Sequence, residues 1–213
     1  MEGFFESGRG EVESALAQLE SLDVTIGRQR ALDFGCGVGR LSKGLAEHFD
    51  EVIGVDIASS MIELAKRYSD GTSNINYLVN VADDLPVFPD DHFDLVVSVI
   101  VLQHMRPKYA RRYLKEFIRV LRPGGALVFQ LPAAAKERPT GRRQRLIDSL
   151  PVPIAERLEA RQRARVVGNH EMHTIERKSV EKLIERQGGT VLKTIEDNAG
   201  GPAWISYRYW IVK

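Results

Sequence analysis

Apolar residues along this chain form short continuous runs, which alternate with stretches where apolar residues recur every three or four positions. The continuous runs are typical of buried strands, and the spaced stretches are typical of helices with one apolar face. We expect strands within residues 31–33, 51–56, 74–81, 94–101 and 126–131, with helices at 41–49, 59–68 and 109–121 between them. Strands that alternate with helices in this way predict an α/β fold with a parallel sheet.

The two ends of the chain depart from this alternation. A helix expected at 179–187 ends at two glycines, and β-rich runs follow at 190–195 and 204–212. The loop between these two runs is short, so we expect an antiparallel hairpin. Before the first strand, an arm at 1–10 is expected to lead into a helix at 11–22.

Residues 132–174 fit neither pattern. Basic residues recur through this stretch, and it is too long for a plain connection between two elements. We interpret it as an insertion that caps a pocket, within a single domain that spans 1–213 and starts with the N-terminal arm and helix (1–30). The basic residues then form either a solvated surface or an electropositive rim for an anionic substrate.

The composition is that of an ordinary globular protein. The 213 residues are 43% hydrophobic and 28% charged, and the net charge of +1 suggests no polyanionic partner. We recognise neither a membrane-spanning run nor a secretory leader in the sequence. The single cysteine, Cys36, excludes an internal disulfide and is consistent with the cytoplasm.

The clearest chemical signal follows the first strand, where Asp33 precedes Gly35, Gly37 and Gly39 in the pattern D-x-G-x-G-x-G. Glycines allow positive φ and let a ligand approach the backbone N–H groups at the start of a helix. A dinucleotide fingerprint would place its third glycine where Arg40 stands, and Asp33 would repel a pyrophosphate. The turn therefore favours a ligand that carries an ammonium group.

Asp56 ends the second strand, 17 residues after Gly39. A carboxylate there is placed to accept hydrogen bonds from both hydroxyls of a ribose, to cap the following helix, or to do both. Ile57 comes next and is expected to pack on an adenine ring. Cys36, inside the turn, is either a small side chain beside the ligand or a passive filler.

These residues resemble motif I of the class I S-adenosylmethionine (SAM)-dependent methyltransferases. Residues 82–97 are similar to the family passage D-A-x-x-L-P-F-x-x-x-x-F-D-L-V, and a further likeness runs from L-Q-H-M to V-L-R-P-G-G-A-L-V-F. The likeness covers residues 31–131 and, less closely, 175–213. It implies a doubly wound, Rossmann-like α/β fold with a mostly parallel seven-stranded sheet, an antiparallel last strand and helices on both faces.

The resemblance also implies SAM as cofactor and S-adenosylhomocysteine as product. The residues expected to bind SAM are Asp33, Gly35, Cys36, Gly37, Gly39, Arg40, Asp56, Ile57, Ala82, Asp83 and Val99. One position departs from the family, which often has an acid before the alanine to receive the adenine amino group; here it is Val81. We expect Asp83 to make that contact instead, and a role in the turn before Leu85 is the alternative.

His104 is the candidate general base for a hydroxyl acceptor. It follows the fourth strand at the carboxyl edge, where ligands of open α/β sheets bind, and histidine titrates near neutral pH. The alternative is a histidine at the start of a helix, bonded to backbone. His170, Glu171 and His173 lie close together in the chain, but their spacing matches no metal signature. We therefore expect these three residues to line the pocket, and we expect no metal.

Missing motifs narrow the choice of acceptor. The stretch 98–101 lacks the double proline of enzymes that act on exocyclic base amines, and the paired glutamates of protein arginine methyltransferases are absent. A small-molecule or saccharide hydroxyl remains, with an anionic metabolite as a further candidate. The saccharide interpretation rests on the likeness of residues 207–210 to glycan-associated members. The acceptor-binding candidates are Arg9, on an arm folding over the pocket, with Arg142, His170, His173 and Tyr207.

Three other functions are weighed. An RNA or other nucleic-acid methyltransferase would use the basic insertion as a phosphate track, but the near-neutral charge and the missing base-recognition motif disfavour it. A non-catalytic SAM-binding module would keep the glycine turn and point His104 inward. A nicotinamide-dependent dehydrogenase is disfavoured by Arg40 and Asp33. The methylated atom and the oligomeric state stay open.

Overall fold

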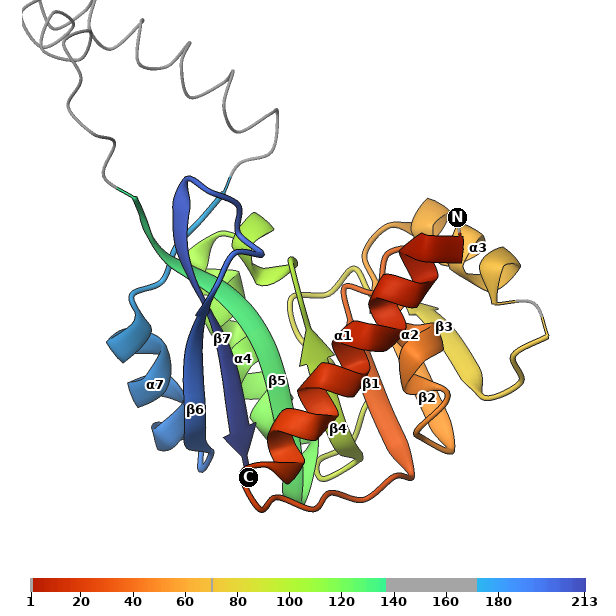
Figure 1. Ribbon diagram of the computed structural model, residues 1–213, viewed down its shortest axis with the longest axis horizontal. Coiled ribbons are helices and arrows are strands. Elements are labelled where there is room, and N and C mark those ends of the chain that lie inside the picture. The colour runs from red at the N-terminus through yellow and green to blue at the C-terminus, as the bar shows by residue number, and fades with distance from the viewer. Residues whose placement is uncertain (1, 70, 137–171) are drawn as a thin grey trace, which may run out of the picture.

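Seven strands form one sheet in the computed structural model, which describes residues 2–69, 71–136 and 172–213. Their order is β3-β2-β1-β4-β5-β7-β6 (Figure 1). The strands are β1 (Arg30–Phe34), β2 (Glu51–Asp56), β3 (Ile75–Val79), β4 (Phe93–Ser98), β5 (Leu121–Ala135), β6 (Thr190–Asp197) and β7 (Trp204–Val212). Neighbours among the first five are parallel, and β7 is antiparallel to both of its neighbours. The predicted doubly wound sheet is confirmed.

Helices cover both faces of the sheet. One face carries α1 (Glu2–Glu20), α2 (Arg40–Leu45) and α3 (Ser59–Tyr68), and the other carries α4 (Pro107–Val120) and α7 (Arg177–Arg186). Figure 1 shows α1 crossing in front of the sheet and α4 behind it. A short 3₁₀-helix, η1 (Leu102–His104), lies between β4 and α4. Among the helices described, none has both the length and the apolar character needed to cross a membrane.

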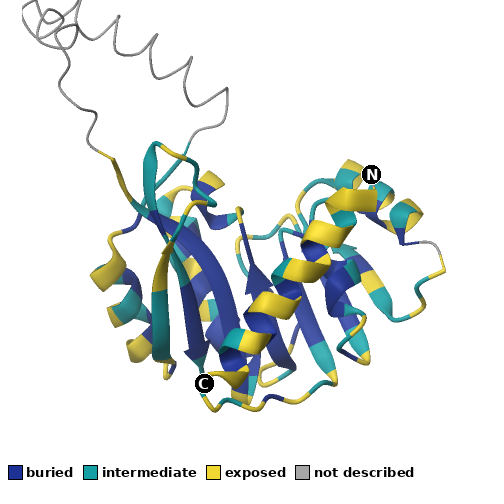
Figure 2. Ribbon diagram, in the orientation of Figure 1, coloured by how far each residue is buried: buried dark blue, intermediate teal, exposed yellow. Residues whose placement is uncertain are grey.

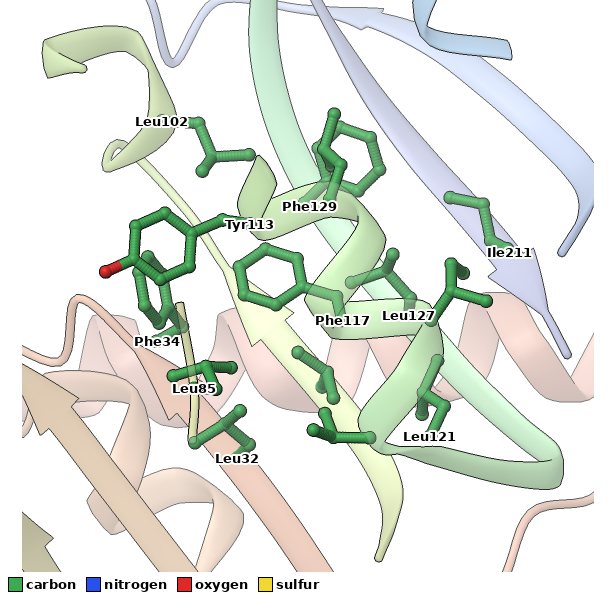
Figure 3. Packing of buried hydrophobic residues seen from close by; sticks show 14 of the residues in the cluster. Leu32, Phe34, Leu85, Leu102, Tyr113, Phe117, Leu121, Leu127, Phe129 and Ile211 are labelled. Carbon is green, nitrogen blue, oxygen red and sulfur yellow. The ribbon is translucent and has the colours of Figure 1, made fainter. Parts of the chain in front are cut away.

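The two faces of the sheet fill separate halves of the hydrophobic core. On the α4 side, Phe34 packs against Tyr113 and Phe117, with ring centroids 4.4 and 4.9 Å apart (Figure 3). On the α1 side, Leu16 and Leu19 pack against strand residues of the opposite pleat. Every residue of β4 is buried, as expected of a central strand with helices on both faces. Figure 2 shows the same burial across the central strands.

Three elements differ from those expected from the sequence. The arm expected at 1–10 is helical, because α1 runs unbroken from Glu2 to Glu20. The fourth strand ends at Ser98, before Ile100, whose φ of 62° is left-handed. The fifth strand reaches Ala135 because β7 pairs with it that far, so the first residues assigned to the insertion belong to the sheet. Most of the insertion, 137–171, lies outside the described residues.

Two glycines set the distance between α1 and α2. A Cβ on Gly8 would lie 2.2 Å from the carbonyl oxygen of Arg40, and a Cβ on Gly44 would lie 3.0 Å from the Cα of Arg9. Contacts this short with backbone atoms cannot be relieved by rotating a side chain. Since α2 begins directly after the glycine turn, this crossing also holds the turn in place.

We expect Gly8→Ala to destabilise the fold by about 1–3 kcal/mol, because the added methyl group overpacks the crossing. Gly10→Ala is the matched control, since it lies on the same helix and its added methyl group would meet no atom within 4 Å. That control should be neutral or stabilise by up to ~1 kcal/mol through helix propensity. Urea unfolding of both variants measures the difference, and equal free energies of unfolding would contradict the tight crossing.

Candidate active site

A cavity of about 740 Å³ opens at the carboxyl ends of β1, β2 and β4. Ligand cavities in proteins span roughly 300–1,000 Å³. The strand order reverses between β1 and β4, and open α/β sheets bind ligands at such a switch point. The lining residues are Phe34, Gly35, Val55, Asp56, Ile57, Asn80, Val81, Ala82, Asp83, Val101, His104, Met105, Arg106, Tyr109, Tyr113 and His173.

The glycine turn takes a backbone path that other residues rarely adopt. Gly35, Gly37 and Gly39 have φ values of 76°, 53° and 84°. A Cβ on Gly35 would lie 2.3 Å from a methyl carbon of Val101, and a Cβ on Gly39 would lie 2.2 Å from the hydroxyl oxygen of Tyr77. Glycine is thus required both for the conformation and for the space. Of the three, Gly35 lines the cavity.

Asp56 joins the glycine turn to the start of α3. The backbone N–H of Gly37 donates to one carboxylate oxygen at 2.9 Å, and that of Ala58 donates to the other, also at 2.9 Å. Asp56 does not cap α3 as the sequence alternative supposed, because Ala58 is the N-cap residue and α3 has no side-chain capping hydrogen bond. The bond from Ala58 instead fixes the turn that leads into α3. Each oxygen of an ionised carboxylate has a second acceptor site. Because Asp56 also lines the cavity, it is able to receive two hydroxyl groups there.

Asp33 lies beneath the turn and not on the cavity lining. Its side chain is 2% exposed, and the Ser42 hydroxyl donates to it at 2.6 Å. Burial raises the pKa of Asp33 to about 6, against the opposing effect of the Ser42 hydrogen bonds. The structure thus places this carboxylate against the start of α2, and Asp33 is not among the residues that line the cavity.

Arg40 points toward α1. Its guanidinium donates to Glu11 at 2.8 Å, and Arg208 of β7 donates to the other oxygen of the same carboxylate at 2.6 Å. These contacts connect α1, α2 and β7, and Arg40 is not among the cavity residues. Cys36 is buried too, and burial raises the pKa of its thiol. A buried thiol of raised pKa is a poor nucleophile, and Cys36 is not among the residues that line the cavity.

Ala82 and Asp83, which follow β3, also line the cavity. The Tyr113 hydroxyl donates to the carbonyl oxygen of Ala82 at 2.6 Å, and Arg112 donates to the Asp83 carboxylate at 2.7 Å. The carboxylate proposed to reach an adenine amino group therefore already has a partner. Ile57 and Val81 line the cavity as well and are 69% and 78% exposed, so the cavity has apolar surface that is open to solvent.

Two histidines line the cavity together. His104 ends η1, and its backbone N–H donates to the carbonyl oxygen of Val101 at 3.0 Å. His173 is held beside it, because its backbone N–H donates to the carbonyl oxygen of Gln103 at 2.8 Å. Arg106, at the start of α4, lines the same cavity. The structure thus brings His104, His173 and Arg106 into the same cavity as Asp56.

Several predicted residues lie elsewhere. Val99 packs in the core beneath α1, Arg9 pairs with Glu47 at 2.7 Å, and the Tyr207 ring lies 5.4 Å from the guanidinium of Arg177. None of these three lines the cavity. Three further candidates, Arg142, His170 and Glu171, lie outside the described residues. Within the described part of the chain, no three acidic, histidine or cysteine side chains gather as a metal site would require.

The sequence did not assign the residues around the start of α4 to the site. These are Val101, Met105, Arg106, Tyr109 and Tyr113, with Asn80 from the end of β3. A signal was available, because a helix that follows a parallel strand begins at the carboxyl edge of the sheet. Its first turns therefore face the ligand site.

Residues 32–129 match the family described as a methyltransferase domain. A ubiquinone biosynthesis O-methyltransferase of Coxiella burnetii is 34% identical over 109 residues, which are 50% of this chain and 44% of that protein. A phosphoethanolamine N-methyltransferase 3 of Arabidopsis thaliana is 33% identical over 129 residues, which are 60% of this chain and 25% of that protein. The matched segments span less than half the length of these curated relatives.

The likeness to solved structures extends over almost the whole chain. Magnesium protoporphyrin IX methyltransferase from Synechocystis PCC 6803, crystallised with bound S-adenosylhomocysteine, has a TM-score of 0.66. It is 17% identical, and the alignment covers 99% of this chain and 85% of that chain. At this identity the comparison shows a shared fold, which is the Rossmann-like fold predicted from the sequence.

The raised pKa of Asp33 predicts that stability falls as pH rises from about 4 to about 6. The ordinary pKa of an aspartate is about 3.9, so in this window the folded state retains a proton that the unfolded state has lost. Asp33→Asn removes this proton uptake. We therefore expect the free energy of unfolding of the wild type to fall by roughly 3 kcal/mol relative to the variant across the window. Denaturant unfolding at several pH values measures this, and parallel profiles would contradict the prediction.

Proposed function

The chain belongs to the class I SAM-dependent methyltransferases, and from that premise we propose that it transfers the methyl group of SAM to an oxygen atom of a small-molecule acceptor. The observation that carries the proposal is the position of Asp56. It lines the cavity, and each of its oxygens is held by one backbone N–H group, from Gly37 and from Ala58. A carboxylate held in this way is pre-organised to bind a pair of ribose hydroxyls.

The rest of the cavity fits the same cofactor. Gly35 leaves the backbone of the turn accessible, and the apolar side chains of Ile57 and Val81 flank the mouth where a purine ring would pack. The Ala82 and Asp83 backbone borders the same region. When bound, SAM supplies an electrophilic methyl group on a sulfonium. The protein's own task is then to place an acceptor in line with that methyl group.

The acceptor is proposed to be small and to carry an anionic or hydroxyl oxygen. Arg106 shares the cavity with His104 and His173, and its guanidinium would attract an anionic metabolite. One relative bears the name O-methyltransferase, which supports an oxygen acceptor. Tyr207, on which the saccharide interpretation depended, does not line the cavity, so the anionic metabolite is the preferred acceptor.

His104 is the residue we propose to contact the acceptor oxygen. A hydroxyl acceptor must lose its proton as it attacks, and a histidine within hydrogen-bond reach is able to serve as general base. A histidine in the same place is also able to donate a hydrogen bond that orients an oxygen. Both roles need the ring at the cavity wall, where η1 places it.

Asp56→Ala should weaken SAM binding roughly 10- to 100-fold, because it removes two hydrogen bonds to a charged acceptor. Isothermal titration calorimetry of the purified chain with SAM measures the dissociation constant. Glu63→Ala is a suitable control, since Glu63 is exposed on α3, the helix that follows Asp56. Equal affinity in the wild type and Asp56→Ala would refute the assignment.

His104→Ala should lower kcat by roughly 100-fold while leaving the dissociation constant of SAM unchanged. The acceptor is first found by a screen of small carboxylates, phenols and phosphorylated metabolites with methyl-labelled SAM, read by mass spectrometry. His173→Ala, tested with the same acceptor, separates the contributions of the two cavity histidines. A loss of SAM binding equal to the loss of kcat would assign His104 a structural role.

A further inference from the structure

A buried chain of polar side chains leads from β7 to His104. Gln130 on β5 and Ser206 on β7 are fully buried, and Gln103 in η1 is 3% exposed. The Gln130 side-chain NH₂ donates to the side-chain oxygen of Gln103 at 3.2 Å and to the hydroxyl of Ser206. Buried amides retain their hydrogen bonds to one another because no water replaces them. The direction of each bond in the chain is therefore well defined.

The donor-to-acceptor direction of these hydrogen bonds is set at one end of the chain by a backbone N–H group, which is only able to donate. The N–H of Ile100 donates to the side-chain oxygen of Gln130 at 3.1 Å. The NH₂ group of Gln130 must then face Gln103, so Gln103 presents its oxygen to Gln130 and its own NH₂ group to His104. The side-chain nitrogen of Gln103 lies 3.3 Å from Nε2 of His104. A ring nitrogen that faces an amide donor is an acceptor and carries no proton.

The anchor of this chain is a strained residue. Ile100 has a φ of 62°, which is rare for a β-branched side chain. Such a conformation persists where the surrounding structure fixes it, and it is concentrated at functional sites. The backbone carbonyl oxygen of Gln103 also accepts a hydrogen bond from the backbone N–H of His173 at 2.8 Å. A single buried glutamine thus holds the segments that carry both cavity histidines.

We propose that Gln103 is a positioning residue that fixes neutral His104 as the tautomer with its proton on Nδ1. The ring then acts as a hydrogen-bond donor and does not remove a proton through Nε2. This part of the proposal rests on the proposed function. Because the Nδ1-protonated tautomer of His104 does not take a proton through Nε2, it favours an acceptor whose oxygen is already ionised, such as a carboxylate. The oxygen–carbon bond forms as the carbon–sulfur bond breaks, and no proton has to leave. Arg106 in the same cavity suits that negative charge.

The test is ¹⁵N NMR of the histidine rings in the cofactor-free protein, with the His104 signals identified by their loss in His104→Ala. The wild type should show a protonated Nδ1 and an unprotonated Nε2 when the ring is neutral. Gln103→Glu should invert this, because a carboxylate only accepts hydrogen bonds and requires a proton on Nε2. A protonated Nε2 in the neutral wild-type ring would overturn the proposal without any variant.

Gln130→Glu is the more specific test, because it is able to change the tautomer of His104 only by turning the Gln103 side chain. With a carboxylate at position 130, Gln103 must turn its NH₂ group toward β5 and its oxygen toward His104, which again requires a proton on Nε2. Gln187→Glu, the same change at the exposed end of α7, is the matched control and should leave the ring signals unchanged. An unchanged tautomer in both Gln103→Glu and Gln130→Glu would overturn the proposal.

The ring spectra need neither SAM nor an acceptor, so they test the positioning role separately from the proposed function. Absence of SAM binding in calorimetry would refute the function and leave the tautomer assignment standing. If SAM binds, the acceptor screen tests the selection: we expect ionised oxygen acceptors to be methylated at least 10-fold faster than neutral alcohols. Preference for neutral alcohols would overturn that selection.

Discussion

The two hydrogen bonds that Asp56 accepts from Gly37 and Ala58 are the interaction on which the site depends. They tie the glycine turn after β1 to the start of α3 after β2, so two successive strand ends become one rigid cavity wall. The carboxylate would be costly to desolvate on its own. Two backbone donors offset that cost and leave acceptor capacity toward the cavity. The same pair of bonds thus stabilises the fold and leaves the carboxylate available for the proposed cofactor contact.

The elements around the turn restrict it further. α1 packs on α2 with almost no space at Gly8, and Glu11 on α1 accepts hydrogen bonds from both Arg40 and Arg208. Asp33, although acidic and adjacent to the turn, is bound from inside by Ser42. Arg40 and Asp33, which the sequence predicts as ligand contacts, are therefore part of the framework that holds the backbone of the glycine turn. A network of buried or half-buried charges gives that framework its geometry.

At His104, the direction of the hydrogen bonds decides which ring nitrogen carries the proton. The chain that begins at the backbone N–H of Ile100 has a single consistent direction through Gln130 and Gln103 to His104. In a dry environment an amide cannot turn without leaving a donor or acceptor unpaired. A histidine at the end of such a chain has its chemical role decided by residues that never touch the substrate.

The sequence by itself determined the alternation of strands and helices along the chain, the glycine turn and the position of Asp56, because hydrophobic periodicity and glycine spacing are local properties of the chain. It did not reveal that the N-terminal segment is one continuous helix, that Arg40 turns toward Glu11, or that Asp83 pairs with Arg112. Those outcomes depend on which side chains from distant segments meet. Only the tertiary structure decides such pairings, since burial and the choice of hydrogen-bond partner arise when the layers pack together.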